Sequence, residues 1–225
     1  MQKFILEILD WSEVWSIFIP LIVLSMKRNQ PAYLKPVIIY LFIALPLYLF
    51  ADIIWKFQRY YHFPHWLQTN NYLYNIHSIV IVVLFSIFFI NLKQSFLEKF
   101  KKIIPFFFIG FVIVNFAFFE NFFDFNLLSS RLLSSAACLL LFYCLQYYFS
   151  KLQEEDDLKM KADFWIVTGL SLYITVSFFV FLFQNTLATN LELFAITIWK
   201  VVDIAYILFC IFIAKAFSLS KGWAM

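Results

Sequence analysis

The chain has 225 residues, of which 64% are hydrophobic and only 14% are charged, and its mean hydropathy is +0.83. A soluble domain is about 45–50% apolar and about 25% charged, so this composition excludes a soluble protein and indicates one that lies in a lipid bilayer. The formal net charge of +3 is small. Because membrane topology accounts for the basic residues, nucleic-acid binding is not expected.

Seven apolar stretches follow one another along the chain, separated by charged or turn-forming segments. A helix needs about 20 apolar residues to cross a bilayer, and the alternating polarity of barrel strands is absent. The sequence therefore predicts an all-α, polytopic membrane protein whose residues 1–225 form one seven-transmembrane helix bundle. The predicted spans are residues 11–26, 36–55, 72–92, 103–123, 127–149, 164–184 and 193–217.

The lysine and arginine residues of the loops predict the orientation, because loops that stay inside carry an excess of them. One side of the predicted bundle holds most of them, which places the N-terminus outside and the C-terminus inside, in the inner (plasma) membrane. The inner-side residues are Lys27, Arg28, Lys35, Lys93, Lys99, Lys101, Lys102, Lys151, Lys159, Lys161, Lys215 and Lys221, and the outer-side residues are Lys3, Lys56 and Arg59.

The strongly polar residues of the predicted spans all fall in the outer half of the bundle. Ionisable groups inside a membrane usually face a bundle interior or a wet cavity and pair with one another. This pattern predicts an outward-facing pocket for a small polar ligand, with Lys200 and Asp203 at its floor. The candidate pocket residues, in chain order, are Asp52 in the second span, Asn75 and His77 in the third, Glu120 in the fourth, Arg131 in the fifth, and Lys200 and Asp203 in the seventh.

The charged residues also have structural interpretations that the sequence leaves open. Lys200 and Asp203 are three residues apart, so on a helix they share one face and can form an ion pair that holds the bundle together. Asp52 lies one turn before Lys56 and can pair with it. Boundary residues whose side chains reach the interface are the alternative interpretation of Lys56, Glu120, Arg131 and Glu192.

Several other residues have a structural interpretation as well. Asn75 and His77 can form hydrogen bonds between helices without contacting a ligand, and Gly169 in the sixth span permits close approach of a neighbouring helix. The three cysteines lie in apolar stretches without metal-binding spacing, so they are expected to be buried thiols. These cysteines are Cys138, Cys144 and Cys210.

Three stretches resemble a group of small seven-span inner-membrane proteins common in the Bacteroidota: YLYNIHSIVIVVLFSIFF (Tyr72–Phe89), LLFYCLQYYFSKL (Leu140–Leu152) and ADFWIVTGLSLYITVSFFVFLF (Ala162–Phe183). The most specific part is the pattern of Phe164, Trp165, Gly169 and Tyr173. The resemblance implies a seven-span fold, and the group has no settled biochemical function. Its members often carry a carboxylate in the third span, where this chain has His77 and Ser78.

Two function classes follow from the predicted pocket. The first is a receptor-like or sensory membrane protein, in which the outer pocket binds a small polar ligand and the inner face docks a protein partner. The alternative is a small-molecule transporter or channel. That class needs a polar route through the inner half, where the stretches IVIVVLFSIFF and ILFCIFIA are apolar.

Enzyme classes are less favoured. A metal-dependent hydrolase needs several histidines for zinc, and His77 is the only histidine inside a predicted span, with His62 and His65 in a loop. A retinal protein with a Schiff base on Lys200 lacks a carboxylate counter-ion in the third span. No catalytic residue, metal site or cofactor is therefore predicted.

Overall fold

The computed structural model describes residues 7–58, 60–61, 64, 67–92, 96–124, 127–154, 161–190 and 192–220. All regular secondary structure in these ranges is helical, which confirms the predicted all-α class. The elements are α2 (Ser12–Met26), the short 3-10 helix η1 (Ala32–Leu34), α3 (Lys35–Phe57), α4 (Asn71–Asn91), α5 (Glu98–Phe118), α6 (Ser130–Glu154), α7 (Ala162–Asn190) and α8 (Glu192–Leu219). Residues 7–10 are also helical.

Six of the described helices, α3 to α8, are long and apolar enough to cross a membrane. They correspond to the predicted second to seventh spans, so the chain is a multi-pass helical membrane protein. The predicted first span corresponds to α2, which is apolar but has only 15 residues. At 1.5 Å per residue α2 is about 22 Å long, shorter than the hydrocarbon layer of about 30 Å.

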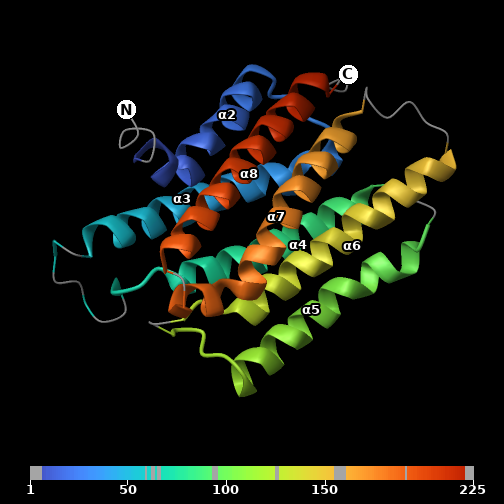
Figure 1. Ribbon diagram of the computed structural model, residues 1–225. Helices are drawn as coiled ribbons and strands as arrows, with labels where there is room; N and C mark the ends of the chain where they lie inside the picture. The colour runs from blue at the N-terminus through green and yellow to red at the C-terminus, as the bar shows by residue number, and fades with distance from the viewer. Residues whose placement is uncertain are drawn as a thin grey trace.

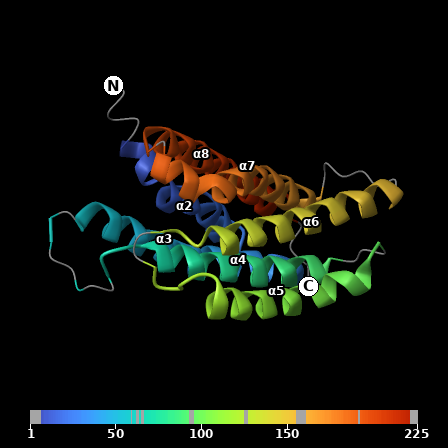
Figure 2. The same cartoon turned by 60° about the horizontal axis from the view of Figure 1, so that its bottom comes forward.

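The helices form a closed ring with one helix outside it (Figures 1 and 2). Around the ring, α2 packs on α3, α3 on α4, α4 on α6, α6 on α7, α7 on α8, and α8 on α2. The remaining helix, α5, packs on the outer side of α4 and α6 (Figure 2). Its exposed Phe106, Phe107 and Phe118 are suited to contact lipid.

The first and last described helices, α2 and α8, lie side by side and run in the same direction. Three contacts join α2 and the residues flanking it to α8 at successive depths, so α2 runs beside residues 200–218 of α8. Lys200 donates to Asp10 at one end, Ser16 Oγ lies 3.4 Å from Cys210 Sγ midway, and Lys27 donates to the carbonyl of Ser218 at the other end.

The two ends of the bundle differ in charge. At the end where α2, α4, α6 and α8 finish, which we call the basic end, the described residues include Lys27, Arg28, Lys35, Lys99, Lys101, Lys102, Lys151, Lys161 and Lys215. At the opposite end, which we call the acidic end, they include Asp10, Glu13, Asp52, Glu120 and Asp203. The other loop cations used for the orientation, Lys3, Arg59, Lys93, Lys159 and Lys221, lie outside the described residues.

The predicted fourth span is displaced by about a turn and a half, and α6 and α7 end five and six residues beyond the predicted fifth and sixth spans. The fourth span was expected at residues 103–123, whereas α5 begins at Glu98 and ends at Phe118. The helix includes Lys101, which the prediction placed in the loop before it. The Lys101 ammonium is buried and donates to the carbonyls of Phe89 and Leu92 at the end of α4. The Leu92 carbonyl follows the end of α4, where a helix leaves carbonyls without an intrahelical partner, while the Phe89 carbonyl also accepts from the Leu92 N–H.

The half of the bundle next to the basic end is packed with aromatic side chains. Phe85, Phe88, Phe89 and Phe209 are fully buried there. Phe89 stacks on Tyr143 with the ring centroids 5.0 Å apart and the planes 4° from parallel. Dispersion contacts between such rings hold the helices together where lipid removes any hydrophobic drive for association.

Gly169 sets the distance between α7 and α8. A β-carbon at this position would lie 2.6 Å from the Phe212 β-carbon, closer than any normal contact, so only glycine fits here. The close approach predicted for Gly169 is therefore confirmed. By contrast, a β-carbon on Gly110 of α5 would meet no heavy atom within 4 Å.

We expect Gly169→Ala to lower the free energy of unfolding by about 1–3 kcal/mol, because the added methyl group forces α7 and α8 apart. Thermal unfolding of the purified protein in detergent measures this loss. Gly110→Ala is the matched control and should leave stability unchanged or raise it slightly, since alanine favours the helix. Equal effects of the two substitutions would contradict the role assigned to Gly169.

Candidate functional site

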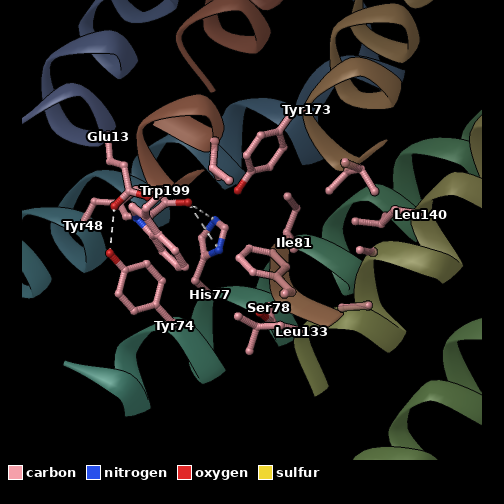
Figure 3. A pocket seen from close by; sticks show the side chains of 15 residues that line it. Glu13, Tyr48, Tyr74, His77, Ser78, Ile81, Leu133, Leu140, Tyr173 and Trp199 are labelled. Carbon is pink, nitrogen blue, oxygen red and sulfur yellow. Dashed lines mark hydrogen bonds between the residues drawn. The ribbon is translucent and has the colours of Figure 1, made fainter. Parts of the chain in front are cut away.

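A small cavity lies inside the ring, lined by residues of all six ring helices (Figure 3). The space open to the centre of a water molecule is about 20 Å³, which holds roughly one or two waters. One side of the cavity is polar and aromatic and includes Glu13, Tyr48, Tyr74, His77 and Trp199. The opposite side, on α6, is apolar and consists of Leu133, Ala136, Ala137 and Leu140.

His77 occupies the centre of a buried tyrosine network. The hydroxyls of Tyr48 and Tyr40 lie 3.0 Å and 3.1 Å from its Nε2 atom, and the Tyr40 hydroxyl also lies 3.3 Å from that of Tyr206. The closest partner of Nδ1 is the Tyr48 hydroxyl at 3.4 Å, which is long for a hydrogen bond. Nδ1 is thus the ring nitrogen with capacity left for a molecule in the cavity.

Glu13 brings a carboxylate to the same cavity from α2. Only 7% of the residue is exposed, and its Oε2 atom accepts a hydrogen bond of 3.0 Å from the Tyr74 hydroxyl (Figure 3). Within the described part of the chain no lysine or arginine forms a salt bridge with it. The Tyr74 ring in turn stands at 85° to the Trp199 ring, with the centroids 5.8 Å apart.

Lys200 and Asp203 form an ion-pair cluster beside the cavity rather than its floor. Lys200 Nζ lies 3.3 Å from Asp203 Oδ2 and also forms a salt bridge with Asp10 of the preceding segment. The ion pair predicted between Lys200 and Asp203 is therefore present on α8. Lys200 also contacts Asp10, which lies just before α2. This three-residue cluster joins the acidic ends of α2 and α8.

Asp52 lies near this cluster without an ion pair of its own among the described residues. It is only 7% exposed, and its Oδ2 atom is buried without a hydrogen-bond partner. Charged groups on several sides are within its electrostatic reach: Lys56, Asp203, Asp10, Lys200 and Glu13. Lys56, which the sequence offered as a partner, instead places its ammonium 4.5 Å from the centre of the Trp11 ring.

The other predicted pocket residues gather at a second place, between α4, α5 and α6. Glu120 accepts hydrogen bonds from the backbone N–H groups of Arg131 and Leu132, at 2.9 Å and 3.3 Å, so it caps the start of α6. Its Oε2 atom also accepts from the Asn115 amide at 2.7 Å. The Arg131 side chain is exposed and lies over the Phe119 ring.

Asn75 links α4 to this second place. Its side chain is buried and donates to the Phe122 carbonyl at 2.9 Å. Of the seven predicted pocket residues, His77 alone lines the cavity, while Asp52, Lys200 and Asp203 lie beside it at the acidic end. The remaining three, Asn75, Glu120 and Arg131, form contacts at the segment that connects α5 to α6.

Sequence reasoning missed Glu13, Tyr48 and Tyr74, which line the polar side of the cavity. It also missed Tyr40 and Tyr206, which extend the hydrogen-bond network of His77. The chain has many aromatic residues, so the tyrosines do not stand out by composition, but their spacing along the helices predicts that some of them share a face. Tyr74, His77 and Ile81 are separated by three and four residues, as are Trp199, Val202 and Tyr206, so each set lies on one helix face. Glu13 lies near the start of the first predicted span, where a charged residue is usually a boundary residue.

Searches against protein-family models, curated proteins and solved structures find no match. Within the described residues, no three histidine, cysteine, aspartate or glutamate side chains group closely enough to hold a metal ion. His62 and His65, which were considered as partners of His77, lie outside the described residues. What the site offers chemically is a carboxylate, an imidazole and several phenols around one small space.

We expect Lys200→Met to destabilise the protein by about 1–3 kcal/mol, because it leaves the carboxylates of Asp10 and Asp203 together without their cation. Asp203→Asn should cost less, since Lys200 keeps its partner Asp10. The double substitution should recover part of the Lys200→Met loss. Thermal unfolding of all three variants in detergent tests the cluster, and strictly additive losses would show that Lys200 and Asp203 do not interact.

Proposed function

We propose that the chain is a receptor-like or sensory membrane protein that binds a small polar ligand in the central cavity and signals through a protein partner at the basic end. The observation that carries the proposal is the cavity itself. It joins a buried carboxylate, His77 and several tyrosine hydroxyls at a depth where isolated polar groups are costly. Such groups are typical of ligand sites in helix bundles.

The proposal includes a seventh crossing by the first helix. Residues 7–10 and α2 are both helical and are separated only by the turn residue Trp11, so together they form a segment of about 20 residues, which suffices to cross a bilayer. Three contacts match α2 and the residues flanking it to residues 200–218 of α8, which make up most of the part of α8 that is long enough to span. A helix that follows a spanning helix over its whole length lies at the same depths in the membrane.

The proposed orientation places the acidic end outside and the basic end inside, in the inner (plasma) membrane. The excess of lysine and arginine at the basic end supports it, because cytoplasmic loops carry such an excess. With seven crossings the N-terminus is then outside and the C-terminus inside. The cavity faces the outside, and the lysine-rich loops face an inner protein partner.

A receptor-like role fits better than the alternative of a transporter or channel. Beyond Tyr40 and Tyr206 toward the basic end, the described interior of the ring is filled by Phe85, Phe88 and Phe209. These side chains offer no hydrogen-bonding group to a hydrated solute. A transporter would have to separate this packed layer, whereas a receptor only needs to transmit a change in helix packing.

Fusions to reporter enzymes test the topology. Alkaline phosphatase, which folds only outside the cytoplasm, should be inactive when fused after Met225 and active when inserted between Tyr60 and Tyr61, near the acidic end. A fluorescent protein that matures only in the cytoplasm should glow at the C-terminal fusion. Phosphatase activity at the C-terminal fusion would reverse the proposed orientation or remove one crossing.

Cysteine accessibility tests the cavity. In a background with Cys138, Cys144 and Cys210 replaced by alanine, Ala136→Cys places a thiol on the cavity wall. Ala216→Cys, a matched control, places one at a fully buried position nearer the basic end. Hydrogen peroxide, a thiol oxidant only slightly larger than water, should oxidise the first at least about tenfold faster, because a dry environment suppresses the thiolate.

Either of two results would contradict the proposed function. Slow reaction at both positions would show that the cavity does not admit solutes from outside. Fast reaction at both would show that water reaches through the aromatic layer, which favours the transporter or channel. A folded sample, verified by its unfolding transition, is required for each variant.

A further inference from the structure

Aromatic faces surround the polar side of the cavity. Trp199 lies between Tyr74 and Phe181, with both centroid distances 5.8 Å. Tyr48 and Tyr173 complete the wall from α3 and α7 (Figure 3). The ring planes stand at 85° for Tyr74 with Trp199 and at 51° for Phe181 with Trp199, so the rings form corners of an enclosure rather than a stack. A cation within about 6 Å of such ring faces is attracted by their negative charge.

The charges around the cavity favour a cation as well. Asp10, Glu13, Asp52 and Asp203 supply four carboxyl groups, whereas Lys56 and Lys200 are the described lysines among them. Lys200 is already engaged by two of the carboxylates. Glu13, at the cavity wall, and the Oδ2 atom of Asp52 have no ion-pair partner among the described residues. Burial disfavours the ionised form of such carboxyl groups, and a positively charged occupant would stabilise that form, whereas an anion would not.

The size and the opposite wall of the cavity restrict the cation further. Space for roughly one or two waters excludes large quaternary ammonium ions. On α6, Ala136 and Ala137 leave room where larger side chains would close the cavity, and their methyl groups offer contact only to an apolar group. The occupant therefore needs N–H donors toward Glu13 and His77 and a short alkyl part toward α6.

We infer that the cavity binds a small primary alkylammonium ion, with the ammonium between Glu13 and the aromatic rings and the alkyl group against Ala136 and Ala137. His77 accepts an N–H bond through Nδ1 when its proton resides on Nε2. The inference rests on the proposed ligand-binding function and names its ligand class. Methylammonium is the smallest member of the class that has both parts.

Calorimetry and thermal unfolding of the purified full-length protein test this inference. Methylammonium chloride should bind saturably and raise the unfolding temperature beyond the effect of sodium chloride at equal ionic strength. Glu13→Gln should weaken binding by about tenfold or more, since it removes the charge that faces the ammonium. Glu98→Gln is the matched control: it makes the same change at an exposed carboxylate paired with Lys102 at the basic end, and should bind as wild type.

A second measurement covers the case in which Glu13→Gln does not fold. Methylammonium should slow the oxidation of Ala136→Cys by hydrogen peroxide at concentrations that saturate binding, whereas sodium chloride and tetramethylammonium should not. Absence of both binding and protection overturns the alkylammonium assignment, and so does unchanged affinity in folded Glu13→Gln.

Neutral acetamide and anionic acetate separate this inference from the proposed function. If either binds saturably and Ala136→Leu, which fills the cavity, abolishes that binding, the protein takes a small polar ligand that is not an alkylammonium ion. The proposed function then stands and the assignment of ligand class is overturned. If none of the three probes binds, both are overturned for ligands of the size that the cavity admits.

Discussion

A polar group inside a bilayer has no water to bond with, and this constraint determines where the chain puts its hydroxyl, imidazole and charged groups. Several of these groups join helices. The Lys101 ammonium of α5 donates to carbonyls at the end of α4, and the Glu120 carboxylate accepts from a backbone N–H at the start of α6. His77 of α4 forms hydrogen bonds with two tyrosines of α3. Because the polar residues are few, their contacts largely determine which helices are neighbours, and apolar side chains fill the space between those helices.

Much of this fold is readable from the sequence because hydropathy and helix length depend only on local composition. The second to seventh predicted spans reappear as α3 to α8, and the depth of Asp52, His77 or Asp203 follows from its position along its helix. The limits of α5 were less predictable, since they depend on Lys101 reaching the carbonyls of another helix. A lysine near a span normally indicates a boundary, and here it lies inside the helix.

The direction in which a side chain points around its helix was the main quantity that sequence reasoning lacked. Depth alone grouped Glu120 and Arg131 with His77, because all lie toward the acidic end. The structure separates them, since α5 lies outside the ring and its connection to α6 forms a polar cluster of its own. Glu13 could not be joined to Tyr74, 61 residues away, without knowing that α2 closes the ring against α8.

The closure of the ring by α2 and α8 has a consequence for biosynthesis. Asp10 and Lys200 are 190 residues apart, and at about 5–20 residues per second the ribosome needs roughly 10–40 s to make the intervening chain. During that time α2 exists without its neighbour, and Glu13 has at most the partners that α3 and α4 supply. The nascent chain therefore passes through an open intermediate that the translocon or a membrane chaperone must shield until the last helix emerges.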